Sequence, residues 1–533
     1  MRGLANLRWT RRTLRLVGIA LIACYVAFGS IASIGAGLTF DDPMEQFTFR
    51  KILRAAAGLL SGNIAEYESE FQSYGGKYYG IGFHTIAYPV QVALQPFLAR
   101  ISHTDPETSL MLGARPVILL LFGMSIVVFY RCARLFVKER SIAGLFSAFY
   151  AANPYLFGHA MINVKDSPFM SVYLLCTYLS LRIAKRQVDG VAHYSMGTLG
   201  AATAALASIR IPGLMIIIQY AFTFLITDQI VGGKSRRILT WRSIAWFFAA
   251  LIPLLVLLFP AVWINPVQEI AAALKFIGWY RQPGCTLTWG QCMPAYATPA
   301  YVFGWLVVKL PLFTLAGIAF IPFAVRKLWP NSFQRIAYLT LLFGSVYVLI
   351  VIIPLRAHLY DETRQLLFIY PLLILCGVVA VYLASPKVAV ACACVSLAIF
   401  AWDQVRLSPY QYVYFNEITR FFEVDRLFET DYWGISAREH ARRLQVSAPF
   451  VGSDCLYADP PWLYRPFMSS DVCVEPLDVI SQRTLPDRIV VAIAYSPNSS
   501  LPPTCEFFSA VTRSLPLSNR NVRLSTAYSC RTR

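Results

Sequence analysis

The sequence has few charged residues for its length. Asp, Glu, Lys and Arg make up 14% of the 533 residues, whereas hydrophobic residues make up 57% and the mean hydropathy is +0.53. An ordinary globular domain is about half apolar and about a quarter charged, so a soluble core cannot bury this much apolar surface. The chain needs a lipid-facing surface, and we expect a helical protein that crosses a membrane many times.

The chain also lacks several motifs that mark other classes of protein. It has neither a Walker-type phosphate loop nor a glycine-rich dinucleotide fingerprint, so a nucleotide-driven pump and a Rossmann enzyme have no support. The formal charge of +18 does not indicate nucleic-acid binding, because the basic residues occur in short clusters between apolar runs. The histidines expected in the outer loops are scattered singly, at His84, His103, His159 and His358, and they suggest no metal site.

The basic clusters predict the topology, because short loops rich in Lys and Arg stay in the cytoplasm. They are Arg2, Arg8, Arg11, Arg12 and Arg15, then Arg131, Arg134, Lys138 and Arg140, then Arg182, Lys185 and Arg186, then Lys234, Arg236, Arg237 and Arg242, then Arg326, Lys327 and Arg335, and finally Lys387. The first cluster places the N-terminus in the cytoplasm. A cleaved signal peptide is the alternative, but the first apolar run is longer than a typical signal core and lacks a clear cleavage site.

Helices fitted between these clusters predict about eleven membrane spans. They lie near 16–39, 116–135, 141–158, 167–185, 194–210, 212–231, 243–264, 300–324, 335–354, 366–384 and 387–402. The odd number places the C-terminus outside. The division is therefore a transmembrane domain at 1–402, with outer loops at 41–115 and 265–299, and a small α/β periplasmic domain at 403–533.

Within the outer regions the sequence predicts a few local elements. Amphipathic stretches at 49–60 and 84–98 suit helices that lie in the membrane interface. The last region contains a helix-like stretch at 435–444 and a strand-like stretch at 489–495. Aromatic residues are frequent in the outer loops and predict an interface belt more than sugar or lipid binding: Tyr74, Tyr78, Tyr79, Trp279, Tyr280 and Trp289.

Cysteine placement agrees with this topology, because disulfides persist in an oxidising compartment. Six cysteines lie in or beside apolar runs, and the other six lie in the outer regions. Cys285 and Cys292 are expected to pair across a short loop. Three pairings remain open for the four later cysteines, which are Cys455, Cys473, Cys505 and Cys530.

Three acidic residues are candidates for catalysis at the outer face. Asp41 and Asp42 follow the first apolar run, and Asp166 stands just before the fourth. A carboxylate near lipid is costly and often marks a site, although a solvated helix end and a helix N-cap are the alternatives for these positions. A carboxylate can accept the proton of an attacking hydroxyl, and paired acids can also hold a divalent metal ion.

Cations expected at the same face could bind a phosphate group. They are Lys77, Lys165, Arg210 and Arg364. Arginine offers a bidentate fork to phosphate oxygens, while extension of the side chain toward the membrane surface is the alternative for Lys165 and Arg210.

The order of several motifs resembles a known family. The motifs are the acidic pair after the first helix, Asn153-Pro154 through His159 to Asn163-Val164-Lys165-Asp166-Ser167-Pro168, Tyr360-Asp361-Glu362-Thr363-Arg364 leading into Leu367-Phe368-Ile369-Tyr370-Pro371, Ser408-Pro409-Tyr410-Gln411-Tyr412-Val413-Tyr414-Phe415-Asn416-Glu417, and Asp431-Tyr432-Trp433-Gly434. This pattern resembles the bacterial relatives of protein O-mannosyltransferases, which are GT-C glycosyltransferases. The resemblance covers residues 16 to 440 and departs from the family after Glu417, where Thr419-Arg420-Phe421 replaces a Gly-Gly pair.

The resemblance implies a polyprenyl-phosphate-linked sugar as donor and a hydroxyl of a protein, lipid or glycan as acceptor. It implies that Asp41 or Asp42 is the general base and that Asp166 orients the acceptor or a metal. It also implies that Arg364 lies on the side of the active site where the donor phosphate binds. The expected enzyme is an inverting glycosyltransferase of the bacterial inner membrane. A lipid or polysaccharide flippase is the main alternative, although its polar residues would lie nearer the bilayer midplane. A scaffold with this fold and no catalysis is a third.

Overall fold

A computed structural model describes residues 11–72, 74–191, 195–232, 238–279, 284–447, 455–481, 488–494 and 504–531. Some residues discussed above lie outside these ranges, namely Arg2, Arg8, Lys234, Arg236, Arg237 and Tyr280, as does the last residue of the strand expected at 489–495.

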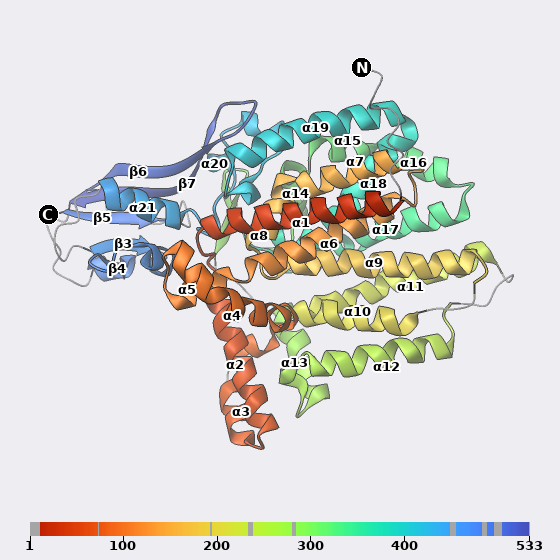
Figure 1. Cartoon of the computed structure of the whole chain (residues 1–533), viewed down its shortest axis with the longest axis horizontal. Coiled ribbons are helices and arrows are strands. Elements are labelled where there is room, and N and C mark those ends of the chain that lie inside the picture. The colour runs from red at the N-terminus through yellow and green to blue at the C-terminus, as the bar shows by residue number, and fades with distance from the viewer. Residues whose placement is uncertain are drawn as a thin grey trace.

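Most of the chain forms a bundle of helices that run along the long axis of the molecule (Figure 1). The bundle helices are α1 (Arg11–Gly35), α6 (Arg115–Ala133), α7 (Arg140–Ala152), α8 (Pro154–Ile162), α9 (Asp166–Val188), α10 (Met196–Ile209), α11 (Ile216–Val231), α12 (Trp241–Leu257), α14 (Pro299–Lys309), α15 (Leu312–Ala319), α16 (Ile321–Leu328), α17 (Ser332–Ile352), α18 (Tyr370–Ala384) and α19 (Pro386–Arg406). Among the described residues, six helices are long and apolar enough to cross a membrane, or seven if the bent pair α14 and α15 forms one span. The other expected spans correspond to α7 with α8, α9, α10 and α12, which are shorter or more polar.

The expected span at 300–324 is wrong as a single helix. Its parts α14 and α15 meet at an angle of 119°. Pro311 lacks a backbone donor and disfavours a helical Leu310, which is extended. The freed backbone groups bond to the Phe-Asn-Glu motif, since Asn416 Nδ2 donates to the Leu310 carbonyl at 3.1 Å and the Leu312 N–H donates to Glu417 at 3.0 Å. This motif therefore stabilises a broken helix.

The expected span at 141–158 is also interrupted, between α7 and α8. Asn153 is the N-cap of α8 and accepts a hydrogen bond from the Leu156 N–H, and Pro154 takes the first helical position. Gly158 allows α8 to pack closely on the segment η5 (Gln411–Val413), because a Cβ at this position would lie 2.1 Å from the Tyr412 nitrogen.

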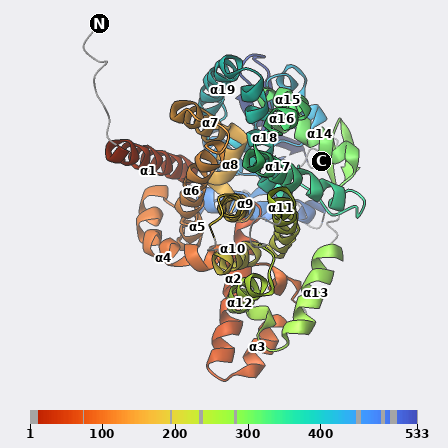
Figure 2. The same ribbon diagram turned by 90° about the vertical axis from the view of Figure 1, so that its right-hand side faces the viewer.

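Between α1 and α6 the chain forms helices that cross the direction of the bundle (Figures 1 and 2). They are α2 (Asp42–Leu60), α3 (Ile64–Phe71), η1 (Gly75–Tyr78), α4 (Gly82–Ser102) and α5 (Pro106–Leu112). Both expected amphipathic stretches are helical and expose apolar side chains, among them Leu60 and Phe97. The later loop contributes η3 (Pro260–Val262), α13 (Pro266–Trp279), β1 (Cys285–Thr288) and β2 (Gln291–Pro294).

The last part of the chain forms a five-stranded sheet at one end of the bundle (Figure 1). The strands are β3 (Cys455–Asp459), β4 (Cys473–Pro476), β5 (Arg488–Ile493), β6 (Cys505–Ser514) and β7 (Asn521–Arg531), in the order β4-β3-β5-β7-β6. Strands β4, β3 and β5 are parallel, whereas β5, β7 and β6 are antiparallel. The predicted fold class is confirmed: a helical polytopic membrane protein with a small α/β domain. Its helix α21 (Ala437–Ser447) begins two residues later than the expected 435–444.

The structure contains three disulfides, all in regions that the sequence predicts to lie outside the membrane. Cys285 pairs with Cys292 between β1 and β2. The pairing left open by the sequence joins neighbouring strands, Cys455 to Cys473 and Cys505 to Cys530. The other cysteines of the chain, at 24, 132, 176, 376, 392 and 394, are free.

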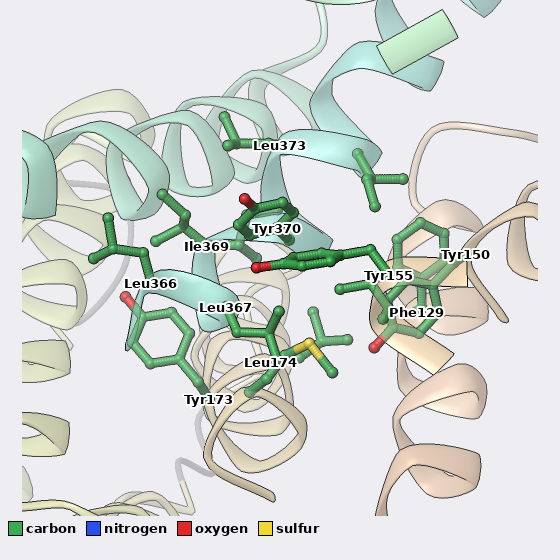
Figure 3. Packing of buried hydrophobic residues seen from close by; sticks show 14 of the residues in the cluster. Phe129, Tyr150, Tyr155, Tyr173, Leu174, Leu366, Leu367, Ile369, Tyr370 and Leu373 are labelled. Atoms are coloured by element: carbon green, nitrogen blue, oxygen red, sulfur yellow. The ribbon is translucent and has the colours of Figure 1, made fainter. Parts of the chain in front are cut away.

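Buried aromatic and aliphatic side chains join the helices that carry the candidate site (Figure 3). Tyr155 of α8 packs against Tyr370 of α18, with ring centroids 5.3 Å apart. Leu174 of α9 and Leu367 of η4 (Arg364–Ile369) lie beside these rings and are fully buried. Because close-packed side chains leave little freedom, this core fixes α9 relative to the segment that begins at Arg364.

Candidate functional site

Asp41 and Asp42 have different surroundings in the structure. The Asp41 side chain is one-third exposed (34%) and accepts a hydrogen bond from Arg364, with Nη1 2.7 Å from Oδ2. The Asp42 side chain is buried; it accepts from the Thr39 N–H at 2.7 Å and from Arg115 Nη2 at 3.1 Å. Asp41 can therefore meet a substrate, whereas Asp42 closes the bend between α1 and α2.

We expect Asp42→Asn to affect stability more than chemistry. The substitution leaves the fully buried Arg115 without its counter-charge, which costs about 3–5 kcal/mol. Thermal unfolding of the purified protein in detergent should show a clear loss of stability, and Arg115→Met should show a similar one. A stable, folded Asp42→Asn protein without activity would contradict this assignment.

Arg364 lies between three carboxylates. Its Nη1 contacts Asp41 and lies 3.9 Å from Oδ2 of Asp166, and its Nη2 is 3.0 Å from Oδ2 of Asp361. The guanidinium group also lies over the ring of Trp433, 5.2 Å from its centroid. The structure thus brings together Asp41, Asp166 and Arg364, which the sequence places far apart.

Asp166 stands at the first turn of α9 and is buried. Its Oδ1 forms an ion pair with Arg210, and its Oδ2 accepts from Asn163 Nδ2 at 3.0 Å. Asn163 also accepts from the Asp166 N–H at 2.7 Å, so the Asn-Val-Lys-Asp motif holds its own turn. Arg210 reaches this carboxylate from the end of α10, where Pro212 and Gly213 end the helix.

Lys165 is engaged by a residue that the sequence did not single out. Its ammonium group forms an ion pair with Glu45 of α2 and lies 3.9 Å from the centroid of the Tyr79 ring. Burial alone would raise the pKa of Glu45, but Lys165 and His84 outweigh it and lower this pKa to about 2. Glu45 lies one helical turn after Asp41, and this spacing is the only feature of the sequence that could have marked Glu45 as a site residue.

This depressed pKa predicts a pH dependence of stability. A carboxylate whose pKa falls from 4.5 to about 2 on folding stabilises the protein above pH 4.5, and the contribution is lost as the pH falls toward 2. We expect Glu45→Gln to lower the melting temperature at pH 6, and the difference from wild type to shrink at pH 3. A difference that is constant with pH would contradict the ion-pair assignment.

Lys77 does not join the cluster around Arg364. Its Nζ lies 3.1 Å from both carboxylate oxygens of Glu269 on α13, and Tyr78 donates to the same carboxylate at 2.8 Å. Burial and this bond raise the pKa of Tyr78 to about 12. The positive charge of Lys77 is thus neutralised by a partner within the chain.

A buried ion pair lies behind the cluster. The side chains of Lys309 and Glu362 are fully buried, and Nζ is 2.6 Å from Oε1. Burial raises the pKa of Glu362 to about 7 against the opposing effect of Lys309. Asp361 and Glu362 both have positive φ, at 54° and 65°, which is strained for residues with a side chain.

The Asp431-Tyr432-Trp433-Gly434 motif forms the wall of the site on the side of the sheet. The Trp433 carbonyl accepts from the Phe40 N–H at 3.0 Å, next to Asp41. Asp431 accepts from the Ser436 N–H at 3.0 Å and so fixes the turn before α21. Gly434 has φ +63°, and a Cβ would lie 2.5 Å from a Leu463 methyl carbon, so only glycine fits this turn.

A pocket opens beside Arg210. It measures about 650 Å³ including its open mouth and is lined by Tyr78, Tyr79, Gly80, Ile209, Arg210, Ile211, Pro212, Phe276, His358, Tyr360 and Gln365. Arg210 is the permanent cation of this lining, and aromatic rings make up much of the rest. The pocket adjoins the carboxylates, because Arg210 pairs with Asp166 and Tyr360 lies 5.0 Å from the Arg364 guanidinium.

The residues described by the structure contain no group of three or more His, Cys, Asp or Glu side chains that could hold a metal ion. Asp41 and Asp166 are each paired with an arginine, which does not fit a metal site. We therefore derive no step through a metal.

No family model matches the chain, and no curated protein matches it. Two solved structures that are similar to it are crystal structures of ArnT from Cupriavidus metallidurans. The one bound to undecaprenyl phosphate shares 12% identity, with a TM-score of 0.46 over 98% of this chain and 98% of that chain. The apo structure shares 14% identity, with a TM-score of 0.44 over 96% of this chain and 98% of that chain.

Proposed function

We propose that the protein is an inner-membrane glycosyltransferase of the GT-C type, which moves a sugar from a polyprenyl-phosphate donor to a hydroxyl of a protein, lipid or glycan. The observation that carries this proposal is the convergence of Asp41, Asp166 and Arg364 beside a pocket that contains Arg210. The N-terminus is proposed to be cytoplasmic and the sheet domain periplasmic, since the sheet lies at the end of the bundle where α1 ends (Figure 1).

The donor is proposed to occupy the pocket beside Arg210. A guanidinium group can bind phosphate oxygens through two parallel hydrogen bonds, and the surrounding aromatic rings suit the apolar beginning of a prenyl chain. Lys165 and Lys77 do not line this pocket, so neither is the principal phosphate ligand in this proposal.

Asp41 is proposed to be the general base. The acceptor oxygen attacks the anomeric carbon, the bond from this carbon to the phosphate oxygen breaks, and the electron pair remains on the phosphate. The acceptor proton passes to the Asp41 carboxylate, while Arg210 and Arg364 offset the charge on the leaving phosphate. A single displacement of this kind inverts the anomeric centre.

Asp41 and Arg364 neutralise each other in the structure. A donor phosphate that draws Arg364 away from Asp41 would expose the base only when the donor is present.

We expect Arg210→Ala to weaken donor binding about tenfold or more, because the pocket loses its permanent cation. Binding can be measured as the shift in melting temperature with undecaprenyl phosphate. Arg210→Lys keeps the charge and should retain part of the shift. An unchanged shift in Arg210→Ala would place the phosphate elsewhere.

Transfer itself is tested with purified protein, polyprenyl-phosphate sugars and candidate acceptors. Sugar transfer that depends on Asp41 supports the proposal. Movement of the lipid across vesicles without any sugar transfer would support a flippase and overturn it.

A further inference from the structure

A second pocket lies between the two outer loops, and none of the steps above uses it. Its volume is about 820 Å³ including its open mouth. Helix α3 forms one side, and η3 with the start of α13 forms the other. Helices α3 and α13 lie across the direction of the bundle helices (Figures 1 and 2).

The lining of this pocket combines exposed polar side chains with buried aromatic ones. Gln72 and Asn265 bring exposed side-chain amides, which make no hydrogen bond or ion pair with the described part of the chain. Tyr67 and Phe71 are buried and lie edge to face, with ring centroids 4.9 Å apart. The Tyr67 hydroxyl donates to the Pro260 carbonyl at 3.0 Å, which ties α3 to η3.

The charge of the lining excludes a phosphate ligand. Glu68 and Glu269 contribute two carboxylates, while Lys77 contributes one cation that is already paired with Glu269. The remaining negative charge would repel an anion. Free amides that both donate and accept, together with the rings of Tyr67 and Phe71, suit a neutral molecule with many hydroxyl groups.

The pocket is separated from the donor pocket by one hydrogen-bonded partition. Tyr78 lines the donor pocket and donates to Glu269, which lines the second pocket. Glu269 and Phe276 lie on the same helix, seven residues or about 10 Å apart, and each lines a different pocket. Beyond the partition, Tyr79 contacts Lys165, the neighbour of Asp166.

We propose that this second pocket binds a neutral sugar unit of the acceptor, at a distance from the hydroxyl that reacts. The acceptor class is then a glycan or glycolipid with more than one sugar unit, rather than a single free hydroxyl compound. This inference rests on the proposed function, and binding at a remote unit lowers the KM for acceptor without changing the chemical step.

The test uses the full chain in detergent with three neutral trisaccharides, composed of glucose, mannose or N-acetylglucosamine, and with glucose 6-phosphate. Saturation-transfer NMR should show binding of at least one trisaccharide and none of the sugar phosphate. The double substitution Gln72→Leu and Asn265→Leu should weaken this binding about fivefold or more. The melting-temperature shift with undecaprenyl phosphate should stay unchanged, because neither residue lines the donor pocket.

Absence of binding for all three trisaccharides, or equal binding in the double variant, would overturn the inference. Asp41→Asn separates it from the proposed function, because that variant should bind the trisaccharide normally. Full transfer activity in Asp41→Asn with intact trisaccharide binding would remove the proposed mechanism and leave the sugar pocket.

Discussion

Replacing Asp41 with Asn is expected to lower the rate of sugar transfer by about 10²–10⁴-fold, the usual contribution of a general base. Asparagine has nearly the same shape and can still accept the hydrogen bond from Arg364, but it cannot take the acceptor proton. The loss should fall on kcat. Donor binding, followed by the melting-temperature shift with undecaprenyl phosphate, should be retained.

Asp361→Asn is the matched control for this experiment. Both substitutions remove one carboxylate from Arg364, and asparagine tolerates the positive φ of 54° at position 361. If Asp41 acts as a base, its variant should lose far more activity than the control. Equal losses would mean that both carboxylates only neutralise Arg364.

The sequence predicted much of the fold because its signals are local. Apolar runs and basic clusters placed the bundle helices within a few residues of their observed ends, as for α6 and α19. The break before α15 also has a local signal, which is Pro311. The prediction relied on hydropathy, which does not detect the break, and it therefore gave α14 and α15 as one span. What supports the break lies about a hundred residues later, in Asn416 and Glu417, and no local pattern connects the two segments.

The candidate site was less accessible from the sequence. Asp41 and Asp42 are adjacent acids at a helix start, and only their burial and their different arginine partners distinguish them. From the sequence alone, Lys77 is a cation with no evident partner. In the structure, Glu269 from another loop lies beside it. Burial and long-range pairing decide these roles, and a single sequence does not show either. The catalytic and binding roles of these residues remain predictions.

The second large effect is expected when the buried ion pair between Lys309 and Glu362 is broken. We expect Lys309→Met to destabilise the protein by about 3–5 kcal/mol, since it leaves Glu362 buried without its partner. The deficit should grow as the pH rises through about 7, because Glu362 ionises there in the wild type but must ionise without a partner in the variant. A buried carboxyl whose pKa is raised, to about 7 even with Lys309 present, stabilises the fold at low pH and loses this contribution as the pH rises.

The same substitution should also disturb the reaction, because the pair holds the strained turn before Arg364. Tyr301 donates to the Glu362 carbonyl at 2.8 Å, so the turn is fixed at both its side chain and its backbone. With Lys309→Met, the positive φ values of Asp361 and Glu362 lose one support, and Arg364 is free to shift from Asp41. Transfer measured well below the melting temperature should then show a lower kcat.

Adding Glu362→Gln removes the unpaired charge and should recover stability more than activity. Recovery of both in equal measure would reduce the pair to a stabilising role, with no part in positioning Arg364.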